Sequence, residues 1–143
     1  MSDTLLNTVT PAQLIDALQQ AGCRATEVRQ DDKVRIQSAA QGLGFIVGFG
    51  NRVPGSEVEE YSDFSFQLLL TVEGEASSEL VAGWNRDRRF ARLAQVANTL
   101  VLSMDVLVAG GVSPAWLRGQ VELWDFVLRE YVRYLQAPAA RAA

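Results

Sequence analysis

The chain has 143 residues, with 13 Lys and Arg against 17 Asp and Glu, so its formal charge is −4 at pH 7. It contains no His, which excludes an imidazole as catalytic base, metal ligand or pH switch. The length suits one domain with a hydrophobic core, and 48% hydrophobic residues are typical of a folded globular protein.

The first predicted element is a helix that begins beside a proline. Thr10 and Gln13 have the spacing of a capping box, in which each side chain bonds the backbone N–H of the other residue. Pro11 suits the first helical position, and Gly22 favours the end of the helix. Cys23, the single cysteine, follows this helix and is expected to be a buried structural thiol.

Strands are predicted where apolar side chains recur at every second residue. The clearest such pattern runs over residues 64–72. Two glycine-rich segments, Gly42-Leu43-Gly44 and Gly48-Phe49-Gly50, lie along an earlier strand instead of joining a strand to a helix. Bulges or close packing under a helix therefore explain these glycines better than a dinucleotide-binding loop does.

Residues 51–63 keep no hydrophobic period and carry four acids, which predicts a solvated, mobile loop. Their spacing is not that of a calcium-binding loop, so a cation site is not favoured. The four acids are Glu57, Glu59, Glu60 and Asp63.

The elements follow the order α-β-β-β-β-α-β-β-α, which predicts an α+β fold with an antiparallel sheet packed against helices. We expect a single domain over residues 1–136 and a frayed tail over 137–143. In chain order the expected ranges are helix 11–21, strands 25–29, 33–38, 43–49 and 64–72, helix 78–88, strands 93–97 and 99–108, and helix 114–135.

The densest group of polar and aromatic residues lies where the second helix should end. It is a capped and solvated helix end, with Trp84 and Phe90 in the core, or an arginine patch that accepts an acidic segment or a phosphate. RNA binding is disfavoured because it would need exposed rings on a basic face. The candidate partner-binding residues are Trp84, Asn85, Arg86, Arg88, Arg89 and Arg92.

Asp105 lies in a predicted strand between Met104 and Val106, with a side chain on the face opposite to theirs. An unpaired buried carboxylate is costly, so Asp105 is expected to face water or to pair with Arg89 or Arg92.

The last predicted helix carries apolar residues on more than one stripe. Either the helix is broadly buried on the sheet, or it also offers a face to a partner or to a second subunit. The candidate residues for that face are Trp116, Leu123, Val127 and Tyr134.

An ordered series of motifs resembles the YbjN domain family, whose members are described as regulators of bacterial sensory transduction. The resemblance implies a fold like that of type III secretion chaperones, which are small α+β domains that commonly dimerise and bind protein segments. It implies an interaction or regulatory domain and no defined reaction. The motifs are Trp84-Asn85, Arg89-Phe90-Ala91, Leu102, Met104-Asp105 and Gly110-Gly111-Val112.

Taken together, the residues and the resemblance favour a non-enzymatic protein-interaction domain with a regulatory or chaperone-like role, and we expect it to form a homodimer. A partner segment would lie along a sheet edge or an apolar groove. The alternative is a sensor that binds a small ligand between sheet and helices, beside Phe45, Phe66 and Trp84. No catalytic residue, cofactor, metal, nucleic acid or membrane is expected. The first ten residues resemble no secretory signal, so a cytoplasmic location is expected.

Overall fold

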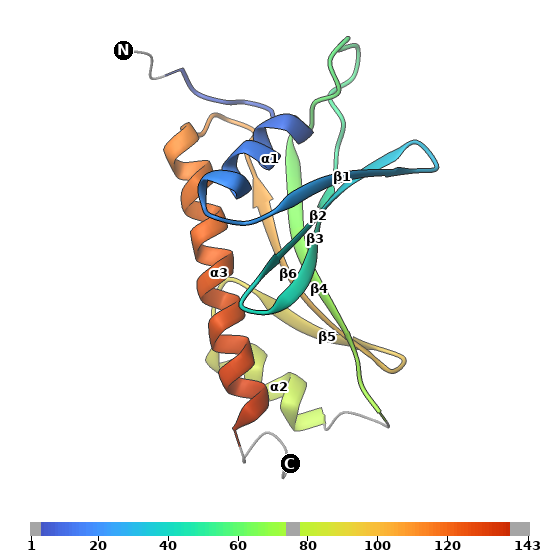
Figure 1. The fold of residues 1–143 in the computed structure, drawn as a ribbon, viewed down its shortest axis with the longest axis vertical. Helices are drawn as coiled ribbons and strands as arrows, with labels where there is room; N and C mark the ends of the chain where they lie inside the picture. The colour runs from blue at the N-terminus through green and yellow to red at the C-terminus, as the bar shows by residue number, and fades with distance from the viewer. Residues whose placement is uncertain (1–3, 74–77, 138–143) are drawn as a thin grey trace.

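The computed structural model describes residues 4–73 and 78–137, which form three helices and one six-stranded antiparallel sheet (Figure 1). The predicted α+β class and element order are confirmed, and each element ends within two residues of its predicted range. The predicted tail lies outside the described residues except for Ala137, the C-cap of the last helix. The elements are α1 Pro11–Gln20, β1 Ala25–Gln30, β2 Lys33–Ala40, β3 Leu43–Phe49, β4 Asp63–Thr71, α2 Ser78–Asp87, β5 Arg92–Val96, β6 Thr99–Leu107 and α3 Pro114–Gln136.

The strands lie side by side in the order β1-β2-β3-β4-β6-β5. The first four pair with their neighbours along the chain, whereas β6 lies between β4 and β5. The β1–β2 turn is tight because Asp31 and Asp32 both have positive φ, at 54° and 61°. Two consecutive residues of this kind match the right-handed twist of a two-residue hairpin.

The capping box at the start of α1 is confirmed. The Gln13 backbone N–H donates to Thr10 Oγ1 at 3.2 Å, and the Thr10 backbone N–H donates to Gln13 Oε1 at 2.9 Å. Two otherwise unpaired helix N-terminal donors are thereby satisfied, which fixes where the chain enters α1.

The hydrophobic core lies between the helices and one face of the sheet. Phe64, Phe66 and Leu68 of β4 are each at most 2% exposed, as the alternation predicted. Trp124 of α3 stacks on Phe66 with ring centroids 5.3 Å apart and meets Phe45 edge-on at 5.8 Å. In Figure 1, α3 runs along the length of the sheet.

The opposite face of the sheet, called the open face below, carries the side chains of alternate strand residues that do not enter this core. Leu69 of β4, Val96 of β5 and Leu107 of β6 are 56%, 64% and 65% exposed on it. No helix of the described ranges packs there, so the sheet has one buried and one solvated face.

Tyr131 of α3 is fully buried, and its hydroxyl has no hydrogen-bond partner among the described residues. Burial raises the pKa of Tyr131 to about 12 from its usual 10.0. The neutral form is therefore favoured in the folded state, and its contribution to stability is present below pH 10.0 and lost as the pH rises through about 12.

Replacing Tyr131 with phenylalanine removes a buried polar atom without removing the ring. We expect the free energy of unfolding at neutral pH to stay unchanged or to rise by about 1 kcal/mol. Above pH 10.0 the Tyr131→Phe variant should lose less stability with rising pH than the original protein, as measured by urea unfolding. The matched variant Tyr134→Phe loses a hydrogen bond to the Leu80 carbonyl at 2.6 Å and should be destabilised; equal losses in both variants would contradict the prediction.

Candidate functional site

Trp84 lies at the centre of the predicted polar and aromatic group, but its side chain is only 1% exposed. Its indole N–H donates to the Ala91 carbonyl at 3.1 Å. Its ring meets Tyr131 and Tyr134 of α3 edge-on, each with centroids 5.4 Å apart. In this fold Trp84 therefore anchors α2 and the α2–β5 junction to α3, and its ring is not available to a partner.

The close approach of α2 to α3 depends on Gly83. A Cβ atom at this position would lie 2.8 Å from the Tyr134 hydroxyl oxygen. That hydroxyl donates to the Leu80 carbonyl, so the tyrosine side chain bridges the two helices. A small residue beside Trp84 thus lets α2 rest against the C-terminal part of α3.

Asn85, the second residue of the Trp-Asn motif, has a structural contact of its own. Its Nδ2 donates to the Leu93 carbonyl and its Oδ1 accepts from the Leu93 backbone N–H, both at 2.8 Å. Its amide therefore bonds both backbone polar groups of one residue in β5. This pair of bonds holds the end of α2 against an edge strand.

Two of the four candidate arginines are engaged in exposed ion pairs. Arg86 bonds Glu79 and Asp87. Arg92 bonds Asp105 at 2.9 Å, which confirms one of the two pairings expected for that carboxylate. Both members of this pair are more than half exposed, at 66% and 61%, so it contributes little to stability.

Arg88 and Arg89 make no ion pair with the described part of the chain. The Arg88 guanidinium lies over the rings of Trp84 and Tyr134, 5.4 and 5.5 Å from their centroids. The Arg89 guanidinium lies 5.1 Å from the centroid of Phe90. Because Arg88 Nε is buried, Arg89 is the member of the predicted group that remains open to an acidic partner.

Phe90 was expected in the core, and this was wrong. Its side chain is 59% exposed, and its backbone has φ +76°, which is rare for a bulky residue. The tight junction between Trp84 and Ala91 turns the backbone at this position, and the ring points outward beneath Arg89. The strained backbone places an aromatic ring on the surface beside unpaired cations.

The candidates on α3 do not share one environment. Trp116 is 40% exposed, whereas Val127 is 3% exposed and belongs to the core. Leu123 and Tyr134 are partly buried and pack against the core. Phe126, which the sequence interpretation did not include, is 49% exposed. A surface on this helix would therefore be built from Trp116, Leu123 and Phe126.

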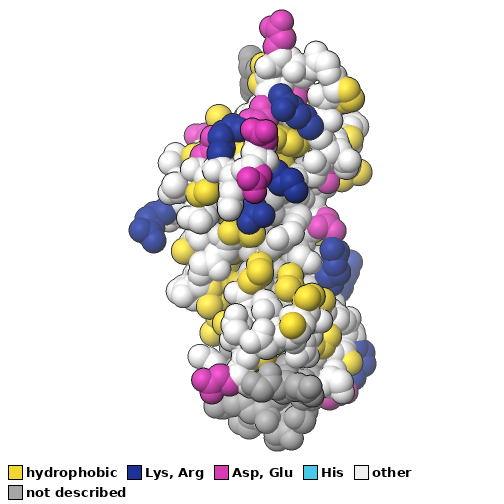
Figure 2. Space-filling view, turned by 90° about the vertical axis from the view of Figure 1, so that its right-hand side faces the viewer, with side chains coloured by type: hydrophobic (Ala, Val, Ile, Leu, Met, Phe, Trp, Pro, Cys, Tyr) yellow, Lys and Arg dark blue, Asp and Glu magenta, His cyan; other side chains and the backbone are white. Residues whose placement is uncertain are grey.

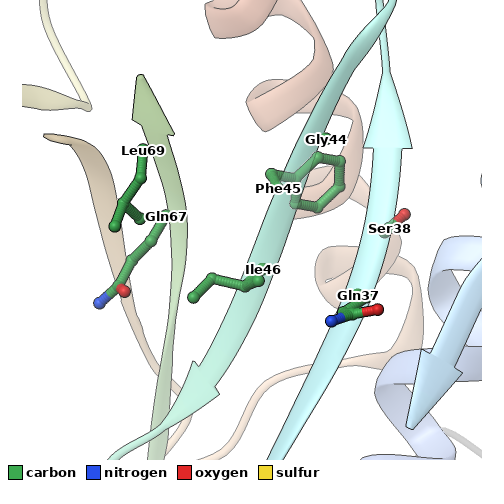
Figure 3. Close-up of a pocket in the computed structure, with 7 residues that line it drawn as sticks. All are labelled: Gln37, Ser38, Gly44, Phe45, Ile46, Gln67 and Leu69. Carbon is green, nitrogen blue, oxygen red and sulfur yellow. The ribbon is translucent and has the colours of Figure 1, made fainter. Parts of the chain in front are cut away.

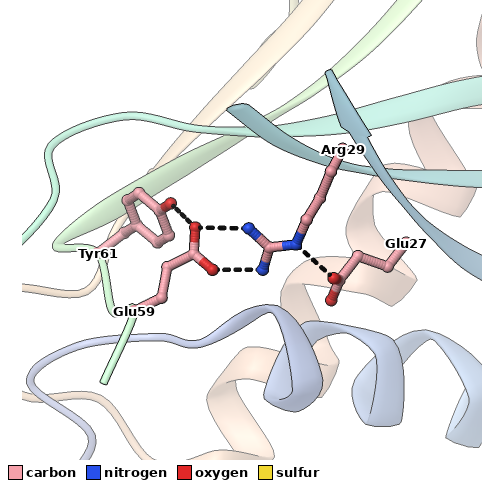
Figure 4. A network of polar contacts seen from close by, with 4 residues as sticks. All are labelled: Glu27, Arg29, Glu59 and Tyr61. Atoms are coloured by element: carbon pink, nitrogen blue, oxygen red, sulfur yellow. Dashed lines mark hydrogen bonds and ion pairs between the residues drawn. The ribbon is translucent and has the colours of Figure 1, made fainter. Parts of the chain in front are cut away.

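The acids of the predicted loop are bound to different partners. Glu59 bonds Arg29 and accepts from the Tyr61 hydroxyl at 2.7 Å (Figure 4). Glu60 accepts from the Thr8 hydroxyl at 2.8 Å. Within the described ranges no group of three or more acids or cysteines could hold a metal ion.

The contact between Glu59 and Arg29 makes stability depend on pH. Hydrogen bonding to Arg29, and then to the Tyr61 hydroxyl, holds the pKa of Glu59 below its ordinary 4.5. The stabilisation is therefore present above pH 4.5 and is lost as the pH falls through the lowered value. In urea unfolding followed from neutral pH into this acidic range, the original protein should lose more stability than Glu59→Gln. Parallel curves for the two proteins would contradict the prediction.

The open face carries a shallow hollow that the sequence interpretation did not identify. The hollow has a volume of about 400 Å³ and is lined mainly by residues of β2, β3 and β4. Figure 3 shows Ile46, Gln67 and Leu69 projecting on the same side of β3 and β4. In Figure 2, hydrophobic side chains are exposed over the middle of the molecule, with charged side chains gathered above them.

The layer proposed for the alternative, ligand-binding interpretation is filled by aromatic side chains. Phe45, Phe66 and Trp84 are each at most 4% exposed. Trp124 packs on the first two rings, and Tyr131 packs on the third. These residues form the core between sheet and helices.

Comparison with known proteins gives one match. A model of the YbjN family, described as "Putative bacterial sensory transduction regulator", matches residues 5–137. No curated protein and no solved structure shows a significant match. Across the described residues, no helix is both long and apolar enough to cross a membrane.

Proposed function

Since the chain belongs to the YbjN family, we propose that it is a non-enzymatic regulator that binds a segment of a partner protein on the open face of its sheet. One observation carries the proposal: Leu69 and Val96 are both more than half exposed near the same end of the β4–β6–β5 part of the sheet, on strands whose other face is buried. Contiguous exposed apolar surface is typical of interaction sites.

An extended segment suits this surface. Its apolar side chains would lie over Ile46 and Leu69, which line the hollow between β3 and β4. Arg89 would accept an acidic part of the partner, as the sequence led us to expect. The expected cytoplasmic location and chaperone-like role form part of this proposal.

The alternative, a small-ligand sensor, needs space between sheet and helices. That layer is occupied by Phe45, Phe66, Trp84 and the α3 rings packed on them. The exposed apolar side chains therefore support the protein-binding proposal better.

Site-specific photo-crosslinking in the source cells tests the proposal. A photoreactive residue replaces Leu69 or Val96 on the open face, and Leu5, which precedes α1 and is 53% exposed, serves as an apolar control. The open-face positions should cross-link to one discrete partner protein, and position 5 should not. Purified partner should then bind Leu5→Lys as well as the original protein and bind Leu69→Lys much more weakly. Absence of cross-links at both open-face positions, or the same products at all three, would refute the proposal.

We also propose that α3 supplies the contact between two copies in a homodimer, through Trp116, Leu123 and Phe126. Partly exposed aromatic residues are enriched at such interfaces. Replacing Trp116 with glutamate should shift sedimentation of the protein from dimer to monomer, while Leu69→Glu on the open face should leave the dimer intact. A monomeric original protein, or a dimer lost only in the Leu69 variant, would contradict this prediction.

A further inference from the structure

A second groove continues the hollow of the open face toward the β1–β2 hairpin. It has a volume of about 640 Å³ and shares Ile46, Gln67 and Leu69 with the apolar hollow. Its far part is lined by residues of the β1–β2 turn, of β2 and of the segment that follows β3. The two hollows thus form one continuous track, which is apolar at one end and charged at the other.

The charged end of the track is cationic in a chain whose net charge is negative. Lys33, Arg35 and Arg52 line it together with one acid, Asp32. None of the three cations forms an ion pair within residues 4–73 and 78–137. The formal charge of the whole chain is −4, so this positive end is a local feature.

The nearby acids offset these cations only in part. Glu59 bonds Arg29 and Tyr61, and its charge also acts on Arg52 without an ion pair. The Asp63 carboxylate accepts from the Asn51 backbone N–H at 2.8 Å and from Asn51 Nδ2 at 3.0 Å. The groove therefore keeps an excess of positive charge that a bound anion could pair with.

Two glycines of β3 form the floor of the track, and the packing of the chain does not require a glycine at either position. Gly44 and Gly48 flank Ile46 on β3, and the pairing of β3 with β2 runs through both without a bulge. A Cβ at Gly48 would meet no atom within 4 Å, and one at Gly44 would meet only the Ser38 carbonyl oxygen at 4.0 Å. Bulges and close packing under a helix, which we expected to explain these glycines, are therefore wrong for Gly44 and Gly48. At Gly50 close packing does hold, against the Asp63 side chain of β4 instead of a helix. Bare strand glycines also mark places where another backbone approaches closely.

We propose that this track binds an extended acidic segment of a partner protein, with apolar side chains over Ile46 and Leu69 and carboxylates at Lys33, Arg35 and Arg52. The inference rests on the proposed function and adds the chemistry and direction of the bound segment. β3 is about 20 Å long at about 3.3 Å per residue, which accommodates about six extended residues.

Charge and surface favour an acidic peptide over other occupants. The phosphates of a nucleic acid would gain nothing from the apolar end of the track, where the apolar side chains of a peptide would be buried. Two of the acids that a second copy could offer, Glu59 and Asp63, are held by internal bonds.

The probe is a fluorescein-labelled synthetic peptide in which a Leu-containing half is joined to a Glu-containing half, beside the same peptide with Gln in place of Glu. Anisotropy measures affinity, and amide shifts of the isotope-labelled protein locate the binding. The acidic peptide should shift the amide signals of residues in β2 and β3 and should bind more tightly than the neutral one.

The triple variant Lys33→Gln, Arg35→Gln, Arg52→Gln should lose affinity for the acidic peptide by about tenfold or more. The control triple on α3, Arg118→Gln, Arg129→Gln, Arg133→Gln, makes the same charge change and should lose less than about twofold.

A second variant tests the bare floor without changing charge. Gly48→Thr places a branched side chain in open space and favours a strand, so its melting temperature should stay equal or rise. Its affinity for the acidic peptide should fall by about tenfold. Binding of Gly48→Thr at full strength, or equal losses in the two triple variants, would overturn the inference.

The outcomes also separate this inference from the proposed function. If position 69 cross-links to a partner but the groove variants bind that partner normally, the proposed function stands and the acidic track is refuted. An oligothymidylate that displaces the peptide and shifts the same amides more strongly would indicate nucleic acid instead. Shifts of the groove amides that depend on protein concentration without peptide would indicate a second copy. Either result would overturn the inference.

Discussion

Replacing Trp84 with alanine is expected to lower the free energy of unfolding by about 3–5 kcal/mol. The ring is 1% exposed, and its loss would leave a cavity between α2 and the Tyr131 and Tyr134 rings. The Ala91 carbonyl would also lose its hydrogen bond from the indole N–H. Since α2 is only ten residues long, it has few other contacts with which to stay in place.

The measurement is urea unfolding followed by circular dichroism, with Phe90→Ala as the matched control. Phe90 is 59% exposed and lies outside the proposed dimer contact, so its removal should change stability by less than about 1 kcal/mol. Trp84→Phe keeps a buried ring and should lie between the two. Equal stability of Trp84→Ala and Phe90→Ala would refute the anchoring role and return Trp84 to the list of partner-binding residues.

The second large effect is expected at Asn85. Its two bonds to the Leu93 backbone disappear in Asn85→Ala, and we expect a loss of about 2 kcal/mol in the free energy of unfolding. Asn85→Asp keeps the acceptor for the Leu93 N–H, but it places a carboxylate oxygen against the Leu93 carbonyl. The aspartate variant should therefore be no more stable than the alanine variant, although its side chain has nearly the original shape.

Amide hydrogen exchange gives a local measure of the same effect. Both Asn85 variants should speed exchange in β5 far more than in β3, because only β5 depends on this side chain. Asp87→Ala is the control on α2, since it removes only an exposed bond to Arg86 and should leave β5 protection unchanged. Normal β5 protection in Asn85→Ala would contradict the proposed role.

Local patterns predicted most of the fold. The alternation of Phe64, Phe66 and Leu68 placed one face of β4 in the core, and the capping residues Thr10 and Gln13 placed the start of α1. These patterns depend on residues that are close together in the sequence, so one sequence is enough to recognise them. The same alternation predicted the face of the sheet on which Asp105 lies. Arg92 forms an ion pair with Asp105 on that face.

Prediction of the functional surface would have required contacts between residues that are distant in sequence. Nothing near Trp84 in the chain reveals that Tyr131 and Tyr134 enclose its ring, or that the junction turns Phe90 outward. The apolar hollow on the open face was also not predicted, since the alternation that places Phe66 in the core does not show which side chains gather on the opposite face. Gly48 could have indicated it, because a strand glycine needs a reason and its own packing supplies none.

The place of β6 in the sheet also bears on how the chain folds during its synthesis. β1 to β4 can pair in the order in which they leave the ribosome, but β6 must pair with β4 and β5 at once. Until Leu107 has emerged, one edge of β4 has no partner strand, and the apolar face that contains Phe66 stays uncovered until α3 has followed. A nascent chain halted before this point would present a bare strand edge, which is a known template for aggregation. The stalled chain, more than the finished protein, is thus the form that would need the help of a cellular folding factor.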